Sequence, residues 1–328
     1  RVLFRSISPP DSSELVPLLN TLFSKLNDKD DKDLVIALLG LFSNEFELTE
    51  ALFADPESSK FIVNTIIQLH SEQDFWQPLF CFWMQFLKQD SSVYRFVGGT
   101  LIESIKSALN LSSSTQLIDA SARLLKRLIK CETTLMDEEE DDEPSDVFTT
   151  LYPLVFENIQ ACPSVEEAVC KLSIFDPKRT MEYLFDEVFP NLSSTVADER
   201  INSLRFTHCV LSTLLDEERM TFQSKILIPL IKDPSLEVRK WCLRCLTLCL
   251  SSIPSKVSIE ICSGYLSQVE LREDIDCLLS ALTEFCGYEY IPAILNLLFE
   301  DAVNRKQFMQ LEDAIENITE TQLLDEFL

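Results

Sequence analysis

Apolar residues recur at the spacing of an α-helix along almost the whole of this 328-residue chain. Strands would require apolar residues at every second position, and runs of that kind are few. Only five glycines occur, so a β-sandwich or a doubly wound sheet would lack the residues that form its tight turns. The sequence therefore predicts an all-α fold.

The periodicity divides the chain into short helices with short connections. The predicted helices span residues 13–26, 34–46, 58–70, 74–89, 94–111, 115–131, 147–161, 164–175, 180–192, 198–216, 217–232, 235–251, 255–268, 272–287, 291–299 and 304–318. Ser164 and Glu167 have the spacing of a capping box, which predicts that a helix starts at Ser164. Many short helices without strands leave two architectures, a globular bundle and a solenoid.

A recurring proline favours the solenoid. Pro153, Pro190 and Pro229 each lie in an apolar helical segment and follow one another at intervals of 37 and 39 residues. Each is followed by a break and a second amphipathic helix. This period is just below the roughly 40–47 residues of HEAT and armadillo repeats. We therefore predict one right-handed α-α superhelix over residues 1–328, built from roughly seven to eight antiparallel helix pairs.

The segment 225–250, KILIPLIKDPSLEVRKWCLRCLTLCL, shows one such unit most clearly. Its second helix has a single narrow polar stripe, formed by Glu237, Lys240, Arg244, Thr247 and Ser251. Nearly everything else in that helix is apolar. A helix with so little polar surface must be covered on both flanks, as an inner helix of a two-layer stack is.

This segment resembles a HEAT repeat, with Asp-Pro in the turn and Val-Arg early in the second helix. The resemblance implies that Asp233 and Arg239, six residues apart, form part of a ladder between adjacent repeats. Arginine suits this role because its five donors can satisfy carbonyls and a carboxylate at a partly buried turn. The preceding segment LSSTVADERINSLRF has a turn and a helix but no Asp–Arg pair, so no ladder is expected there.

The net charge of −26 limits the possible partners. Binding to nucleic acid or to an anionic membrane surface requires clustered Lys and Arg, so neither is expected. Proteins with basic segments are favoured instead, since opposite charge accelerates association. No run of 18 apolar residues is present, which predicts no membrane insertion. The chain begins with Arg1, and we interpret it as a fragment of a longer protein.

Seven consecutive carboxylates interrupt the helical pattern. They are Asp137, Glu138, Glu139, Glu140, Asp141, Asp142 and Glu143. Like charges repel and stay solvated, which predicts a disordered-type loop over residues 136–146. The run lacks the alternating ligands and the glycine of a calcium loop. It is either a plain exposed loop or a site that binds a basic partner or competes with basic cargo.

The segment DFWQPLFCFWMQFLKQD contains more aromatic residues than one helix face needs. Most of them are expected in the core. Phe75, Trp76, Phe82 and Trp83 are candidates for an exposed groove that binds apolar peptide segments, because exposed aromatic residues mark binding sites.

Residues suited to catalysis or metal binding are sparse. Cys242, Cys245 and Cys249 share one helix face, but structural zinc requires four ligands, and His70 and His208 are the only histidines. We interpret the cysteines as reduced, small packing residues and His208 as a semi-buried helix residue. No phosphate loop, GxSxG, HExxH or kinase signature occurs. The sequence thus predicts neither an enzyme nor a cofactor.

The order of segments resembles the importin-β superfamily, in particular its exportin and SR-protein transportin branch. The resemblance lies in FCFWMQFL, the acidic run, DVFTTLYPLVFENI and RTMEYLFDEVF. It implies a nuclear transport receptor, in the cytoplasm or nucleus, that binds basic cargo, the GTPase Ran and Phe-Gly nucleoporins. The alternative is a HEAT scaffold subunit of a phosphatase, chromosome-organising, trafficking or assembly complex, without transport activity.

Overall fold

The computed structural model describes the backbone of residues 21, 32–44, 64, 66–89, 91–112, 114–138, 146–214, 227, 229–230 and 233–250. Within these residues every regular element is helical, as predicted. The helices predicted at 13–26, 217–232 and beyond residue 251 lie wholly or largely outside the described residues. No described helix is long and apolar enough to cross a membrane.

The chain forms two compact units, Arg1–Pro177 and Lys178–Leu328. The α-helices of the first unit are α2 (Lys32–Asn44), α5 (Trp76–Gln89), α6 (Tyr94–Leu111), α7 (Thr115–Glu138), α8 (Tyr152–Glu157) and α9 (Pro163–Phe175). Short 3-10 helices precede α5, α6 and α8: η1 (Gln73–Phe75), η2 (Ser91–Val93) and η3 (Asp146–Leu151).

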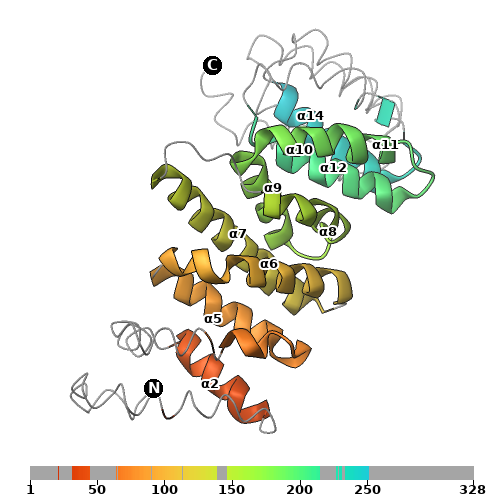
Figure 1. Ribbon diagram of the computed structural model, residues 1–328. Coiled ribbons are helices and arrows are strands. Elements are labelled where there is room, and N and C mark those ends of the chain that lie inside the picture. The colour runs from red at the N-terminus through yellow and green to blue at the C-terminus, as the bar shows by residue number, and fades with distance from the viewer. Residues whose placement is uncertain are drawn as a thin grey trace, which may run out of the picture. The chain divides into compact units, whose positions relative to one another are not determined.

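The first unit has two layers (Figure 1). Helices α2, α5, α7 and α9 pack side by side in that order and form one layer, while α6 packs against η3 and α8 in the other. The layers meet mainly where α6 lies on α7. Alternate helices of the sequence therefore belong to the same layer, which is the arrangement of stacked helical repeats.

The second unit contains α10 (Pro177–Tyr183), the π turn η4 (Leu184–Val188), α11 (Phe189–Asn191), α12 (Ala197–Leu211) and α14 (Leu236–Leu250). Here α12 packs along α14, and η4 and α11 contact α12. The π turn ends two residues before Pro190, which has no N–H to donate to the carbonyl four residues earlier. The sequence predicted a regular helix over 180–192 and did not predict this widening.

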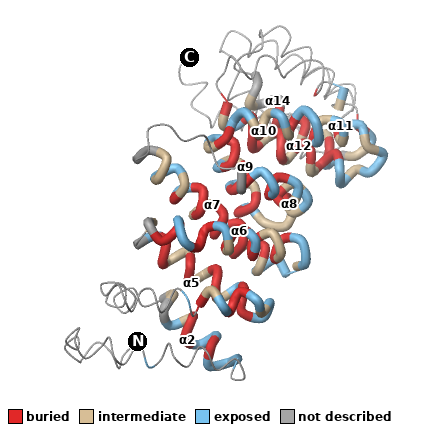
Figure 2. The backbone as a smooth tube through the Cα atoms, in the orientation of Figure 1, coloured by how far each residue is buried: buried red, intermediate tan, exposed pale blue. Residues whose placement is uncertain are grey.

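Buried residues recur along α5, α6 and α7 of the first unit, interrupted by intermediate and exposed ones (Figure 2). The largest fully buried ones belong to the aromatic segment of η1 and α5, together with Phe206 and Leu39. A hydrogen bond joins α8 to α6 within the second layer. Asn158, at the end of α8, donates to the carbonyl of Leu109 in α6 at 3.2 Å.

Two helix boundaries differ from the prediction. Helix α7 continues to Glu138 rather than ending at Cys131, so the first residues of the predicted acidic loop are helical. Helix α9 begins at Pro163 because proline suits the first helical position, and its N-cap is Cys162. The predicted capping box is therefore wrong. The Ser164 hydroxyl donates to the Asp119 carboxylate of α7 at 2.6 Å, and Glu167 pairs with Lys126 of α7.

Candidate interaction surfaces

His70 is the polar centre of the aromatic core in the first unit. Its Nε2 accepts a hydrogen bond from Trp83 Nε1 at 2.8 Å, and Trp76 Nε1 donates to its carbonyl at 2.9 Å. An indole N–H can only donate, so the proton of the neutral imidazole is on Nδ1. That nitrogen lies 2.8 Å from Ser104 Oγ, whose hydroxyl donates in turn to the carbonyl of Thr100.

The environment of His70 keeps the imidazole neutral. Burial lowers its pKa to about 4. A proton on Nε2 would also set two donors against each other at Trp83. The network therefore holds one tautomer and one charge state, as a structural core histidine does.

The predicted aromatic groove is wrong. Phe75 and Trp83 are 0% exposed, Phe82 is 1% exposed and Trp76 is 6% exposed. Both indole N–H groups are satisfied inside the protein by His70, so the two tryptophans can be buried without losing a hydrogen bond. The density of aromatic residues in this segment reflects core packing between α5 and its neighbours.

The cysteines of α14 contribute packing. Cys242 and Cys245 are fully buried, and their thiols contact the carbonyls of Leu227 at 3.1 Å and Leu204 at 3.2 Å. The Cys245 contact ties α14 to α12. The Cys249 side chain lies outside the described residues. Among the residues whose side chains are described, no group of three or more His, Cys, Asp or Glu could hold a metal ion.

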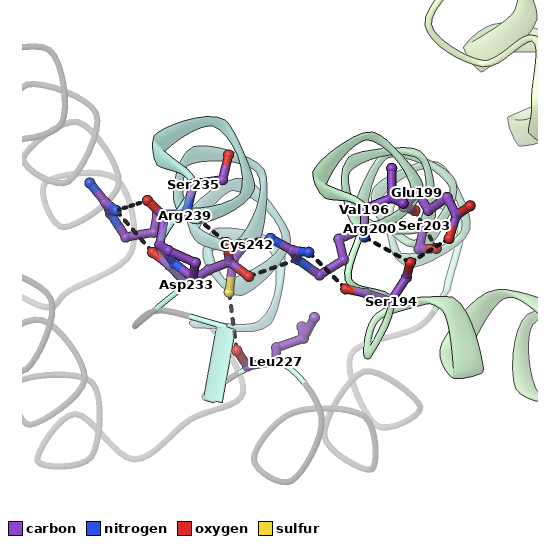
Figure 3. A network of polar contacts seen from close by, with 11 residues as sticks. Ser194, Val196, Glu199, Arg200, Ser203, Leu227, Asp233, Ser235, Arg239 and Cys242 are labelled. Atoms are coloured by element: carbon purple, nitrogen blue, oxygen red, sulfur yellow. Dashed lines mark hydrogen bonds and ion pairs between the residues drawn. The ribbon is translucent and has the colours of Figure 1, made fainter.

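An ion pair links α12 to the turn before α14 (Figure 3). Arg200 donates from Nε to Asp233 Oδ2 at 2.8 Å and from its terminal nitrogen to Oδ1 at 2.9 Å. Arg200 and Asp233 are each 8% exposed. Asp233 also accepts from the backbone N–H of Ser235. Arg239 donates to the backbone carbonyl of Asp233 at 2.9 Å.

The same turn occurs 39 residues earlier in the sequence. Arg200 donates to the carbonyl of Ser194, six residues before it, at 2.7 Å, as Arg239 does to Asp233. The Ser194 hydroxyl accepts the N–H of Val196, as the Asp233 carboxylate accepts that of Ser235. The expectation that this segment has no ladder residue is wrong, because Ser194 occupies the aspartate position and the arginine is retained.

The acidic run is only partly described. Asp137 and Glu138 end α7, and Glu139–Glu143 lie outside the described residues. A role for these carboxylates in binding a basic partner stays a prediction.

Two guanidinium groups lie over the half-exposed ring of Trp241 in α14. Arg205 of α12 stands 4.8 Å from the indole centre, and Arg244 stands 4.4 Å from it. His208 meets the ring edge-on at 5.8 Å and is half-buried, as predicted. The contact from Arg205 joins α12 to α14 and helps to pack the two helices, while the contact from Arg244 lies within α14.

A groove of about 1160 Å³ crosses α5, α7 and α9 in the first unit. Among the described residues, six cationic side chains and a single carboxylate, Glu167, line it. The cations are Lys88, Arg123, Lys126, Arg127, Lys130 and Lys171. Apolar side chains lie among them: Met84, Ile129, Met136, Ile174 and Phe175. The sequence did not reveal this site, because its residues are spread over three helices and only the packing of those helices brings them together.

Solved structures of the karyopherin Kap121p have this fold. Kap121p bound to RanGTP matches with a TM-score of 0.68 and 14% identity, over 93% of this chain and 35% of that chain. Another crystal structure of Kap121p matches with a TM-score of 0.68 and 13% identity, over 94% of this chain and 34% of that chain. Kap121p bound to Nup53p matches with a TM-score of 0.64 and 14% identity, over 97% and 35%.

These matches confirm the predicted fold class. The chain has the fold of an all-α solenoid of HEAT type, as the Kap121p structures do. It spans about a third of the length of the Kap121p chains. No protein-family model matches the sequence, and no curated protein matches it.

Proposed function

We propose that this chain is part of a nuclear transport receptor that binds proteins and catalyses no reaction. The observation that carries the proposal is the shared fold along 93% of the chain with Kap121p bound to RanGTP. HEAT solenoids present long surfaces that hold other proteins. The receptor would work in the cytoplasm and the nucleus.

Three classes of partner follow from this proposal. Kap121p has been crystallised with RanGTP, with Pho4p, with the SUMO protease Ulp1p and with Nup53p. By analogy, the present protein would bind Ran in its GTP form, a basic cargo and Phe-Gly nucleoporins. The net charge of −26 supports basic cargo, since long-range attraction accelerates association.

A pull-down tests the proposal. The full-length protein that carries these residues is immobilised and offered Ran locked in its GTP form, Ran with GDP, and a Phe-Gly repeat fragment. We expect retention of GTP-locked Ran and of the repeats, and no retention of Ran with GDP. If the protein binds neither GTP-locked Ran nor the Phe-Gly repeats, the proposed transport function is refuted. A HEAT scaffold without transport activity is then favoured.

A further inference from the structure

We propose that the groove across α5, α7 and α9 is a docking site for an acidic peptide segment with interspersed apolar residues. This partner has the opposite charge to the basic cargo proposed above, so the inference goes beyond the transport function and does not depend on it. Every described residue that lines the groove belongs to the first unit.

The groove concentrates positive charge in an acidic protein. The chain has 28 Lys and Arg against 54 Asp and Glu, yet the described residues that line this site include six cations and one carboxylate. Four of the cations, Arg123, Lys126, Arg127 and Lys130, recur on α7 at intervals of three, one and three residues. This spacing places them along one side of that helix. Adjacent like charges repel, so a bound anion would relieve an unfavourable local field.

Most of these cations have no carboxylate partner among the described residues. Arg123 pairs with Asp119, and Lys126 pairs with Glu167. Lys130 and Lys171 form no ion pair with any described residue. The Arg127 Nε atom is buried and makes no hydrogen bond within the described part of the chain. The Lys126–Glu167 ion pair is an example of a carboxylate bound by a lysine of the groove.

The apolar component selects a peptide rather than a simple anion. Ile174 is 62% exposed beside the cations, and Met84, Met136 and Phe175 are half-buried. Methionines adapt to varied apolar partners. A segment that alternates carboxylates with Leu, Ile or Phe would satisfy both components.

Nucleic acid fits the groove less well. Single strands are held by rows of stacking aromatic side chains as well as by cations, and among the described residues that line the groove only Phe175 is aromatic. The net charge of −26 repels a long polyanion, whereas a short acidic peptide meets mainly the local field.

Fluorescence polarisation tests the proposal on the intact chain. The probe is a fluorescein-labelled peptide in which Glu pairs alternate with Leu or Phe, and its control has Gln for Glu. We expect binding of the Glu peptide alone, with an affinity that falls as salt rises. The variant K130E/K171E should weaken binding at least about tenfold, since it reverses two charges in the groove.

The matched control is K178E/K240E, which changes the net charge equally at lysines that do not line the groove. Circular dichroism establishes that both variants are folded, and K130Q/K171Q replaces the reversal if it is not. No binding of the Glu peptide, or equal weakening in both variants, would overturn the proposal. Tighter binding of single-stranded RNA through the same lysines, or a dimer broken by K130E/K171E in sedimentation, would overturn it in favour of another occupant.

Discussion

At the scale of single residues, His70 illustrates how partners dictate a charge state. Trp83 can only donate to Nε2, so Nε2 must accept, and Nδ1 must keep the proton. The sequence identified His70 as one of two histidines but could not show this role, because the indole and Ser104 that define it are distant in the chain. The sequence also did not show which aromatic side chains are exposed. Four buried aromatic residues were therefore assigned to a groove.

Acid should destabilise the first unit through His70. The folded-state pKa of His70 is about 4 and its ordinary value is 6.5, so the unfolded chain binds the proton more tightly. The free energy of unfolding should fall as pH drops from about 6.5 to about 4, by up to about 3 kcal/mol in total. Below the lower pKa this contribution is constant.

Urea denaturation of wild type and H70N at several pH values measures this effect. The carboxylates of the chain also titrate below pH 5, so the difference between the two proteins isolates the histidine. Parallel pH profiles for wild type and H70N would contradict the assignment.

Removal of one partner from the buried ion pair between Arg200 and Asp233 should destabilise the protein. R200A leaves the Asp233 carboxylate buried without its two arginine donors, which should lower the free energy of unfolding by about 3–5 kcal/mol. R200K keeps the charge but not the two-pronged geometry. The double variant R200A/D233A should be more stable than R200A, and a cost for R200A below about 1 kcal/mol would be inconsistent with a buried pair.

At the scale of helices, the sequence predicted well where helices occur. It predicted their first and last residues less well. Helix α6 has the predicted bounds, because its apolar spacing starts and stops sharply. Helix α7 runs on into the acidic run, which local charge alone did not indicate. The capping box failed because Ser164 and Glu167 both bond to α7, and the π turn before Pro190 depends on backbone geometry that no side-chain pattern records.

Substitution by alanine at two adjacent glycines of α6 should change the stability of the protein in opposite directions. A methyl group on Gly98 would lie 2.7 Å from the ring of the buried Tyr94, while one on Gly99 would meet nothing within 4 Å. G98A should therefore destabilise the chain by about 1–3 kcal/mol through overpacking. G99A should stabilise it by about 0.5–1 kcal/mol, since alanine favours the helix. Thermal melts of both variants decide, and equal shifts would refute the packing at Tyr94.

At the scale of the whole molecule, net charge and local charge lead to different partners. The chain carries −26 overall, and composition alone therefore indicated basic partners. The groove cations were not predicted because their positions extend from Lys88 to Lys171. Arg200 could have been found, since it follows a turn residue by the same six positions as Arg239.

Association with a lysine-rich peptide should be fast and sensitive to salt. We expect its rate constant to fall at least about tenfold between about 0.01 M and about 0.5 M salt, because screening removes the long-range attraction. Stopped-flow fluorescence measures this rate, with a glutamine-substituted peptide as the control. A rate that does not change with salt would show that the overall charge does not guide binding.

The positions of the tryptophans make the protein its own optical probe. Of the three in the chain, Trp76 and Trp83 are buried in the first unit, and Trp241 is half-exposed in the second. W241F would leave an emission signal from the first unit alone, and W76F/W83F one from the second alone. Melting each unit could then be followed separately, in an unlabelled chain, by the colour and intensity of its intrinsic fluorescence.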